Sequence, residues 1–289
     1  MPTDIIAKKI KDLNKAYAMF SPLTNMPYVE CEEENFYDRV RLYEDEEDAK
    51  KAAEELEDDG IRIQVRELTV QESYVPVNAR EPKGPKKKMY LNHVRQHIGI
   101  LPFIGVNAVG YCPKGSELLT VELSGILPEG FEEKVGKNAL YQPNLQLTGL
   151  YLMQEARRKK EWVDMKHLQE LDEEFGSNLA KSRLFMAVLP PEGQEKEQKV
   201  NLKECRIPYL KHQNGDIFFP LFSDIWEYQK YAKGNKTLRP IQIPFADITK
   251  FWVNDAKAYM LNPMGMSLPL SKEMVPRLLQ KFGVSKNPS

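Results

Sequence analysis

The stretch Phe219-Pro220-Leu221-Phe222-Ser223-Asp224 predicts a β-strand that ends at a helix cap. Apolar and aromatic residues favour the strand, and the hydroxyl and carboxylate that follow are side chains that cap a first helical turn. A counterpart in the first half of the chain, Val40-Arg41-Leu42-Tyr43-Glu44-Asp45, leads into an acidic, alanine-rich helix. These two stretches decide the fold because they belong to a pattern that occurs twice.

The pattern continues in the same order in both halves of the chain. After each predicted helix comes a β-rich run, at residues 61–65 and 238–243, and then a strand that stops at a Pro-x-Gly turn. The two turns are Cys112-Pro113-Lys114-Gly115 and Asn262-Pro263-Met264-Gly265. Four elements that recur in one order indicate two diverged copies of a single module.

Strand and helix signals interleave without a strict βαβ rhythm, which predicts an α+β fold with a mixed sheet and packed helices in each copy. We predict a first module over residues 1–130 and a second over residues 138–284 that begins with two helices. The first copy is longer by roughly 29 residues between cap and turn, and these are placed in a lysine-rich insertion near residues 69–96. Prolines and a glycine in the insertion predict irregular structure there.

Local signals in the second module agree with this interpretation. Asn214-Gly215 is typical of a tight hairpin turn, and Asp224 with Glu227 has the spacing of a capping box. Pro244 predicts the start of a further helix.

The composition is that of a globular protein without a general attraction for polyanions. Of the 289 residues, 42% are hydrophobic and 29% charged, and the formal net charge is −1. Nucleic acid or an anionic membrane would therefore need a local basic patch. We find no signal-peptide pattern, no apolar run long enough to span a membrane, and three cysteines without CxxC spacing. These features predict a cytoplasmic protein with reduced thiols and without a membrane partner; nucleic acid is not favoured.

The second half of the sequence resembles the SseB family, named for enhanced serine sensitivity in bacteria. The resemblance rests on Asn144-Leu145-Gln146-Leu147-Thr148-Gly149-Leu150, Asn178 to Arg183, Asn214-Gly215-Asp216, Pro220 to Asp224, Pro244-Phe245 and Leu261-Asn262-Pro263-x-Gly265. The first copy departs from this pattern at Glu44 and at Cys112. The resemblance implies a bacterial cytoplasmic protein with a tandem architecture, and it implies no catalytic residue.

Polar residues at the predicted strand ends are the candidate ligand- or partner-binding residues: Phe222, Ser223, Asp224, Asn262 and Gly265. A serine at a strand-to-helix junction is superficially like a nucleophile elbow, but the flanking glycines of an elbow are missing, so a helix cap is the simpler interpretation. The amide of Asn262 can bind a ligand at the end of a strand, although turn chemistry already explains this residue.

Two further groups carry possible chemistry in the first module. His93 and His97 would share one helix face, yet two ligands do not make a metal site, and we expect no metal and no cofactor. A basic patch at Lys83, Lys86, Lys87 and Lys88 can hold an acidic partner or a phosphate, with a solvated loop as the simpler interpretation.

The sequence favours a non-enzymatic binding or regulatory protein with an unknown protein or small-molecule partner. The reason is partly negative, since no phosphate-binding glycine loop, metal-ligand cluster or acid–base pair is recognisable. Two alternatives stay open: an enzyme with a site assembled around Ser223, Asp224 and Asn262, and a serine-responsive sensor suggested by the family name. The oligomeric state is also open.

Overall fold

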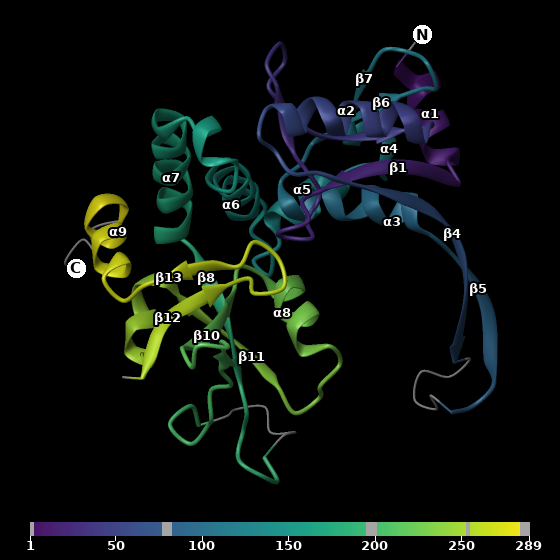
Figure 1. Ribbon diagram of the computed structural model, residues 1–289. Helices are drawn as coiled ribbons and strands as arrows, with labels where there is room; N and C mark the ends of the chain where they lie inside the picture. Colours follow the sequence, from purple (N-terminus) through teal and green to yellow (C-terminus); the bar gives the residue numbers. More distant parts are fainter. Residues whose placement is uncertain (1–2, 77–82, 195–200, 253–254, 284–289) are drawn as a thin grey trace. The chain divides into compact units, whose positions relative to one another are not determined.

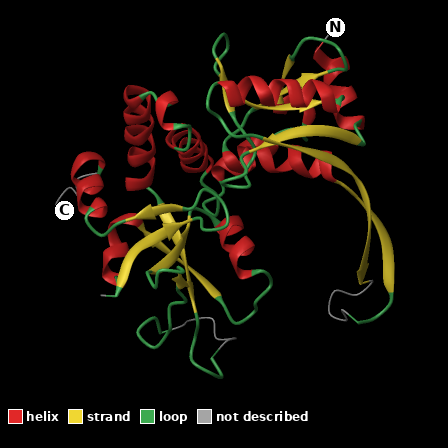
Figure 2. Ribbon diagram, in the orientation of Figure 1, coloured by secondary structure: helices red, strands yellow, loops and turns green. Residues whose placement is uncertain are grey.

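The computed structural model describes residues 3–76, 83–194, 201–252 and 255–283. The chain forms two compact units, the first made of Met1–Pro22 and Pro27–Val135, the second of Leu23–Met26 and Gly136–Ser289. Each unit combines helices with one mixed sheet (Figure 2). Among the described helices, none has both the length and the apolar character needed to cross a bilayer.

Unit 1 contains a sheet of antiparallel and parallel strands with short connecting helices. In chain order its elements are α1 (Thr3–Asp12), β1 (Lys15–Phe20), β2 (Glu30–Glu32), β3 (Tyr37–Tyr43), α2 (Glu46–Asp58), β4 (Gln64–Pro76), β5 (Lys86–Asn92), α3 (His93–Ile100), the 3-10 helix η1 (Leu101–Ile104), β6 (Ala108–Cys112), β7 (Leu119–Glu122), α4 (Leu123–Ile126) and α5 (Phe131–Lys137).

The sheet of unit 1 has the order β5-β4-β1-β3-β6-β7, with β2 beside β3. Only the β3–β6 pair is parallel. Helices cover both faces, as Figure 1 shows for α2 and α3. Met19 packs in the cluster under α2, while its neighbour Phe20 contacts the ring of His97 on α3. Successive strand residues point to opposite faces, so β1 is buried along nearly its whole length.

Unit 2 begins with two helices and then repeats the same kind of sheet. Its elements are α6 (Pro143–Ala156), the 3-10 helix η2 (Lys160–Trp162), α7 (Met165–Ala180), β8 (Arg183–Val188), β9 (Leu210–Lys211), β10 (Ile217–Phe222), α8 (Ile225–Ala232), β11 (Arg239–Pro244), the 3-10 helix η3 (Phe245–Phe251), β12 (Ala256–Leu261), β13 (Leu268–Leu270) and α9 (Met274–Phe282).

The sheet of unit 2 has the order β11-β8-β10-β12-β13, with β9 beside β10, and only β10–β12 is parallel. Phe185 and Phe222 pack with α8 on one face. Leu184 and Leu221 belong to the larger core on the other face, together with residues of α6, α7 and α9.

The two sheets have the same topology, strand for strand. β4, β1, β3, β6 and β7 of unit 1 correspond to β11, β8, β10, β12 and β13 of unit 2, and β2 corresponds to β9. The parallel register pairs Leu42 with Tyr111 in unit 1 and Leu221 with Leu261 in unit 2, so both Pro-x-Gly turns follow the same strand at the same place. The predicted α+β fold, two diverged modules with a mixed sheet each, is confirmed.

The insertion near residues 69–96 is more regular than its prolines suggest. β4 continues to Pro76, and its last seven residues pair with β5, from the Val70–Asn92 pair to the Pro76–Lys86 pair. α3 then begins at His93. Antiparallel pairing satisfies the backbone of both strands, while Pro76 and Pro85 lie at their ends, where a missing N–H is tolerated. The part of the insertion at residues 77–82 lies outside the described residues.

Local predictions for the second module agree with the structure, with one refinement. Gly215 has φ of +91° in the turn between β9 and β10, and α6 and α7 are the two predicted helices. The segment after Pro244 is the 3-10 helix η3 rather than an α-helix. A short helix that the sequence analysis did not predict, α5, lies in the expected connection between the modules.

Candidate functional site

Three of the residues predicted at the strand ends of unit 2, Ser223, Asp224 and Asn262, belong to a hydrogen-bonded network. We call Gln146, Ser223, Asp224, Glu227 and Asn262 the buried polar network, because none is more than 2% exposed. Ser223, Asp224 and Asn262 follow the parallel strands β10 and β12, whose carboxyl ends meet at one edge. Gln146 comes from α6 and Glu227 from the first turn of α8.

Asn262 organises the connection between the two strand ends. Its φ of +48° lies in the left-handed region, which asparagine tolerates better than most residues. Its Oδ1 accepts the backbone N–H of Ser223 at 2.8 Å, and its Nδ2 donates to Ser223 Oγ at 2.8 Å. Ser223 Oγ in turn donates to Asp224 Oδ2 at 3.0 Å.

Asp224 caps α8, as the sequence predicts. Its Oδ1 accepts the backbone N–H of Glu227 at 2.9 Å, which satisfies one of the free donors at the helix start. Its Oδ2 also accepts Gln146 Nε2 at 2.8 Å. The carboxylate is thus shared between the cap and a contact with α6.

Glu227 completes the network from the other side. Burial raises the pKa of its carboxyl group, against the opposing effect of Lys230, whose Nζ lies 2.6 Å from Oε1. A side chain at Gly265 would place its Cβ 3.0 Å from Glu227 Oε2, so glycine gives the Glu227 carboxyl group room that any other residue would restrict. Phe222 lies beneath the network and contacts the ring of Tyr228 edge-on at 5.7 Å.

The buried polar network serves the backbone and its own members. Ser223 is 0% exposed, and its hydroxyl is held between Asn262 and Asp224. The hydroxyl is therefore closed to a substrate in this structure. These residues therefore hold the strand ends and α8 in place, and we place the candidate binding site elsewhere.

The corresponding edge of unit 1 is built differently. Glu44 accepts the hydroxyl of Tyr111 and the backbone N–H of Lys114 at 3.2 Å, and Lys9 Nζ lies 2.8 Å from it. The Cys112 thiol donates to the Ser116 carbonyl at 3.1 Å, and burial raises its pKa, so it is not an activated nucleophile.

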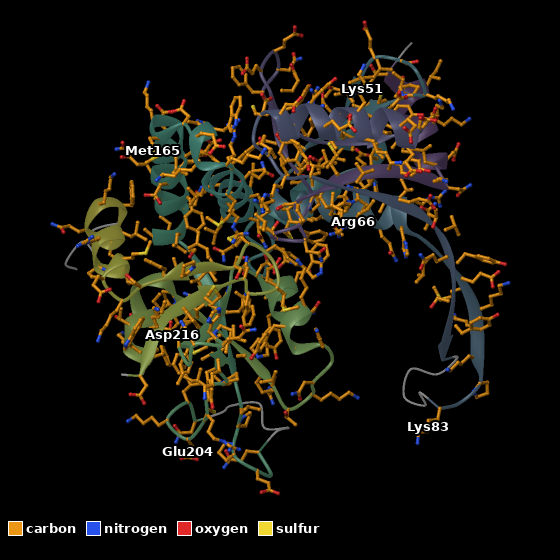
Figure 3. All side chains as sticks on the ribbon, in the orientation of Figure 1. Lys51, Arg66, Lys83, Met165, Glu204 and Asp216 are labelled. Atoms are coloured by element: carbon orange, nitrogen blue, oxygen red, sulfur yellow. The ribbon has the colours of Figure 1, made fainter. Side chains whose placement is uncertain are left out.

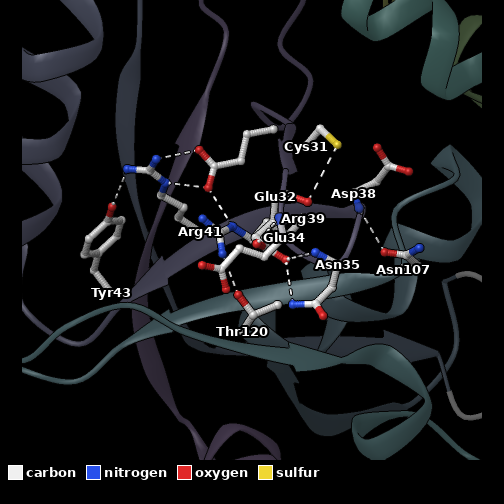
Figure 4. A network of polar contacts seen from close by, with 11 residues as sticks. Cys31, Glu32, Glu34, Asn35, Asp38, Arg39, Arg41, Tyr43, Asn107 and Thr120 are labelled. Carbon is white, nitrogen blue, oxygen red and sulfur yellow. Dashed lines mark hydrogen bonds and ion pairs between the residues drawn. The ribbon is translucent and has the colours of Figure 1, made fainter.

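Two half-buried arginines of unit 1 are also paired. Arg39 and Arg41 both pair with the carboxylate of Glu30, with shortest N–O distances of 2.7 Å and 2.5 Å. Figure 4 shows the two arginines within their network of polar contacts. Arg41 Nη1 donates further to the Tyr43 hydroxyl at 3.5 Å. This cluster ties β2 to β3, and its charges are engaged within the sheet.

The two histidines are placed on α3 as predicted, but they do not share an open site. His97 is buried against Phe20, with ring centroids 5.4 Å apart, and burial lowers its pKa to about 4. Within the described parts of the chain, no three His, Cys, Asp or Glu side chains gather as a metal centre would require.

The four lysines of the predicted basic patch surround the free end of the β4–β5 ribbon. Lys83, labelled in Figure 3, lies shortly before β5. Lys86, Lys87 and Lys88 are consecutive residues of that strand, and all four lysines are exposed. The expected irregular loop is therefore a strand for three of the four lysines.

An open apolar groove in unit 2 was not predicted from the sequence. It has a volume of about 770 Å³ and lies among α6, α7, α9 and β13. Its apolar lining includes Met153, Met165, Leu168, Phe175, Met274 and Leu278. Polar groups are few: Gln169 and Asp172 on α7 and Arg277 on α9.

The groove forms because α9 packs closely against only one part of α7. The start of α7 is left exposed to solvent. A Cβ at Gly176 would lie 2.9 Å from Leu278 and 3.0 Å from Phe282, so glycine allows α9 to approach. Lys281 Nζ lies 2.7 Å from Glu173, across the same two helices. At the start of α7, by contrast, Met165 is 70% exposed (Figure 3).

The lining favours binding over catalysis. The volume falls within the range of about 300–1,000 Å³ that is usual for ligand sites. Methionine side chains are flexible and polarizable, and they suit surfaces that adapt to apolar partners. The sequence signal for this surface is the helical spacing of the apolar residues Met165 and Leu168, a pattern that does not by itself distinguish a packed face from an open one.

Comparisons with known proteins give little further information. No protein-family model and no curated protein matches the chain. Solved structures that resemble it include Anabaena Tic22, labelled protein transport, with 10% identity, a TM-score of 0.21 and 100% of both chains covered. Tic22 from Plasmodium falciparum has 12% identity and a TM-score of 0.19, covering 97% of this chain and 99% of that chain. Likenesses this remote assign neither a family nor a function.

The predicted resemblance to the SseB family is wrong. No family model supports it, and the solved structures that resemble the chain are Tic22 proteins. The motifs that suggested it are explained by local structure: Asn214-Gly215 is a hairpin turn, and Asp224 and Asn262 belong to the buried polar network. The bacterial origin and the serine sensor, which rested on the family name, lose their basis.

Proposed function

We propose that the chain is a non-enzymatic binding protein whose unit 2 accepts the apolar face of an amphipathic helix. The observation that carries the proposal is the open groove between α7 and α9, with its methionine-rich lining. No acid–base pair or nucleophile is part of that lining, which consists of thioethers, hydrocarbon and three polar side chains.

A helical segment fits the groove better than a small polar ligand. Two amphipathic helices that diverge leave a channel into which the apolar stripe of a third helix can pack. Asp172 on α7 and Arg277 on α9 are exposed on its lining and of opposite charge, so they favour a bound helix with basic and acidic residues flanking its apolar stripe.

The test uses a fluorescein-labelled synthetic helix with leucines on one face and lysine and glutamate on the other. Binding is measured by fluorescence anisotropy, with a peptide of the same composition and scrambled order as the control. The groove variant is Met165→Glu with Gln169→Glu, two exposed positions whose replacement leaves the core intact.

We expect the amphipathic peptide to bind and the groove variant to weaken binding about tenfold or more, because each change puts a charge on an apolar contact surface. The matched control, Lys166→Gln with Glu170→Gln, alters the same helix away from the groove lining and should leave binding unchanged. Equal affinity for the scrambled peptide, or for the groove variant, would contradict the proposal.

We also infer a reducing, cytoplasmic location for the protein. The three cysteines are unpaired, and Cys31 is exposed to solvent. An exposed free thiol is compatible with the cytoplasm and is prone to oxidation elsewhere. Imaging of the tagged chain in its native cell checks this inference.

A further inference from the structure

The β4–β5 ribbon of unit 1 extends beyond the module that the two units share. β4 pairs with β1 as far as Thr69, and from Val70 onward it pairs with β5. The corresponding strand of unit 2, β11, leads directly into η3. We call residues 70–76 of β4 and Lys86–Asn92 of β5 the arm. A two-stranded ribbon gains little stability by itself, so a partner surface is a physical reason for keeping one.

One face of the arm combines aromatic rings with ammonium groups. Residues paired directly across an antiparallel ribbon share a face, and Tyr74 is paired with Lys88 and Glu72 with Tyr90. Tyr74 is 60% and Tyr90 63% exposed. Lys88 Nζ lies 5.1 Å from the centroid of the Tyr90 ring and 2.6 Å from Glu72. Lys86 alternates with Lys88 and so lies on the same face.

This face has the chemistry to recognise carboxylates. Lysine ammonium groups and tyrosine hydroxyls are both donors. Tyrosine-to-carboxylate hydrogen bonds already occur within unit 1, where Tyr37 donates to Glu122 at 2.6 Å and Tyr17 to Glu67 at 3.3 Å. An acidic protein surface would be bound by the same contacts.

The chain itself carries such a surface at the carboxyl end of α2. Glu54, Glu55, Glu57 and Asp58 are exposed there, and the last turn contains no basic residue. The partial negative charge at a helix carboxyl terminus makes this arrangement unfavourable in isolation and favours a bound cation. Lys50 of the same helix does not offset this negative charge, because it is already paired with Glu46 and Glu47 in the first turn.

We propose that the arm of one copy docks on the acidic carboxyl end of α2 in a second copy. An arm is too far from its own α2 to make this contact. α2 is followed closely by Gln64, the first residue of β4, and Tyr74 lies ten residues further along the strand, roughly 33 Å away at the usual strand rise. The face of the arm that carries the lysines and tyrosines can therefore contact the acidic end of α2 only in a second molecule.

Charge also favours the contact between the arm and α2 over direct pairing of the arms of two copies. Pairing β5 with β5 of another copy would bring the lysines of both strands together, which like-charge repulsion disfavours. A net charge of −1 leaves no general repulsion between two copies. Reciprocal docking, each arm on the other copy's α2, forms a symmetric dimer and engages both surfaces.

The test is a charge-reversal series examined by sedimentation velocity, with circular dichroism as a check of folding. The arm variant is Lys86→Glu and Lys88→Glu on the proposed face, together with Lys83→Glu shortly before β5, and the helix variant is Glu54→Lys, Glu57→Lys and Asp58→Lys; all six side chains are exposed. A matched control, Lys160→Glu, Lys203→Glu and Lys236→Glu, changes the net charge as much as the arm variant does, but in unit 2.

The wild-type chain and the control are expected to dimerise at low ionic strength, with dimerisation weakening as salt is raised. Each variant alone should dimerise about tenfold more weakly or not at all. A mixture of the arm and helix variants should form a heterodimer, because both contacts are then between opposite charges.

Three results would overturn the proposal. The first is a wild-type chain that stays monomeric at low salt. The second is a dimer that survives both reversals. The third is a mixture that fails to associate although both variants are folded. Binding of single-stranded DNA or anionic vesicles by a monomeric wild type, lost in the arm variant, would assign the arm to a different partner.

Discussion

Asn262 connects two strand ends through both its backbone conformation and its side-chain hydrogen bonds. Its left-handed backbone makes the turn after β12, and its side chain holds the backbone and hydroxyl of Ser223. The Asn-Pro-x-Gly pattern predicted the turn. It could not predict the contact with Ser223, which is 39 residues away in sequence.

His97 provides a pH-dependent prediction at the same scale. Burial lowers its pKa from 6.5 to about 4, because the charged imidazole is poorly solvated beside Phe20. The unfolded chain therefore binds the proton first. The stability associated with a neutral His97 is fully present above pH 6.5 and is lost as the pH falls toward 4, a change of about 3 kcal/mol.

The measurement is urea unfolding of the wild type and of His97→Gln from pH 7 to pH 4. Carboxylates titrate in both proteins, so the difference between the two curves isolates the histidine. The wild type should lose more stability than the variant over this interval; parallel curves would show that His97 is solvated in the folded state.

At the scale of elements, the two corresponding helices α2 and α8 have the same cap in different surroundings. Asp224 caps α8 inside the buried polar network, while Asp45 caps α2 near the surface and also pairs with Lys114 at 2.9 Å. Asp224→Ala leaves the Ser223 hydroxyl buried without its acceptor and removes the nearer of the two acceptors of Gln146 Nε2, so we expect it to cost about 3 kcal/mol. Asp45→Ala should cost much less.

Hydrogen–deuterium exchange of the first-turn amides of α2 and α8 distinguishes the two cases. Protection of α8 should fall strongly in Asp224→Ala and protection of α2 only slightly in Asp45→Ala. Similar losses in both variants would mean that the network around Asp224 adds nothing to ordinary capping.

At the scale of the whole molecule, the duplicated topology predicts that the arm is dispensable for folding. Unit 2 has the same sheet order without a corresponding ribbon. Val70 and Asn92 are directly paired, so an Asn-Gly turn can join them when residues 71–91 are removed. We expect the shortened chain to keep the circular dichroism of the wild type and a melting temperature within a few degrees of it, while losing self-association.

Melting and sedimentation of the shortened chain check the prediction together. A chain that no longer folds would show that the ribbon supports the sheet, and it would remove the argument from topology. A shortened chain that folds and still dimerises would place the interface outside the arm.

Short-range sequence patterns were enough to predict the repeated order of elements, the α+β class, the caps and the turns. Each of these follows from neighbouring residues: an apolar and aromatic run from Phe219 to Phe222, a carboxylate at Asp224, and Asn and Gly at turn positions. Such signals act over a few residues, so they can be recognised without knowing the rest of the fold.

The tertiary structure alone decided what these residues face. Asp224 and Asn262 are part of a buried network because α6 places Gln146 against them. The apolar residues Met165 and Leu168 of α7 line a groove because α9 contacts α7 only in part. The prolines of the insertion suggested a loop, yet the pairing of β5 with β4 made it a ribbon. Burial and strand pairing depend on partners distant in the chain, and no local pattern specifies them.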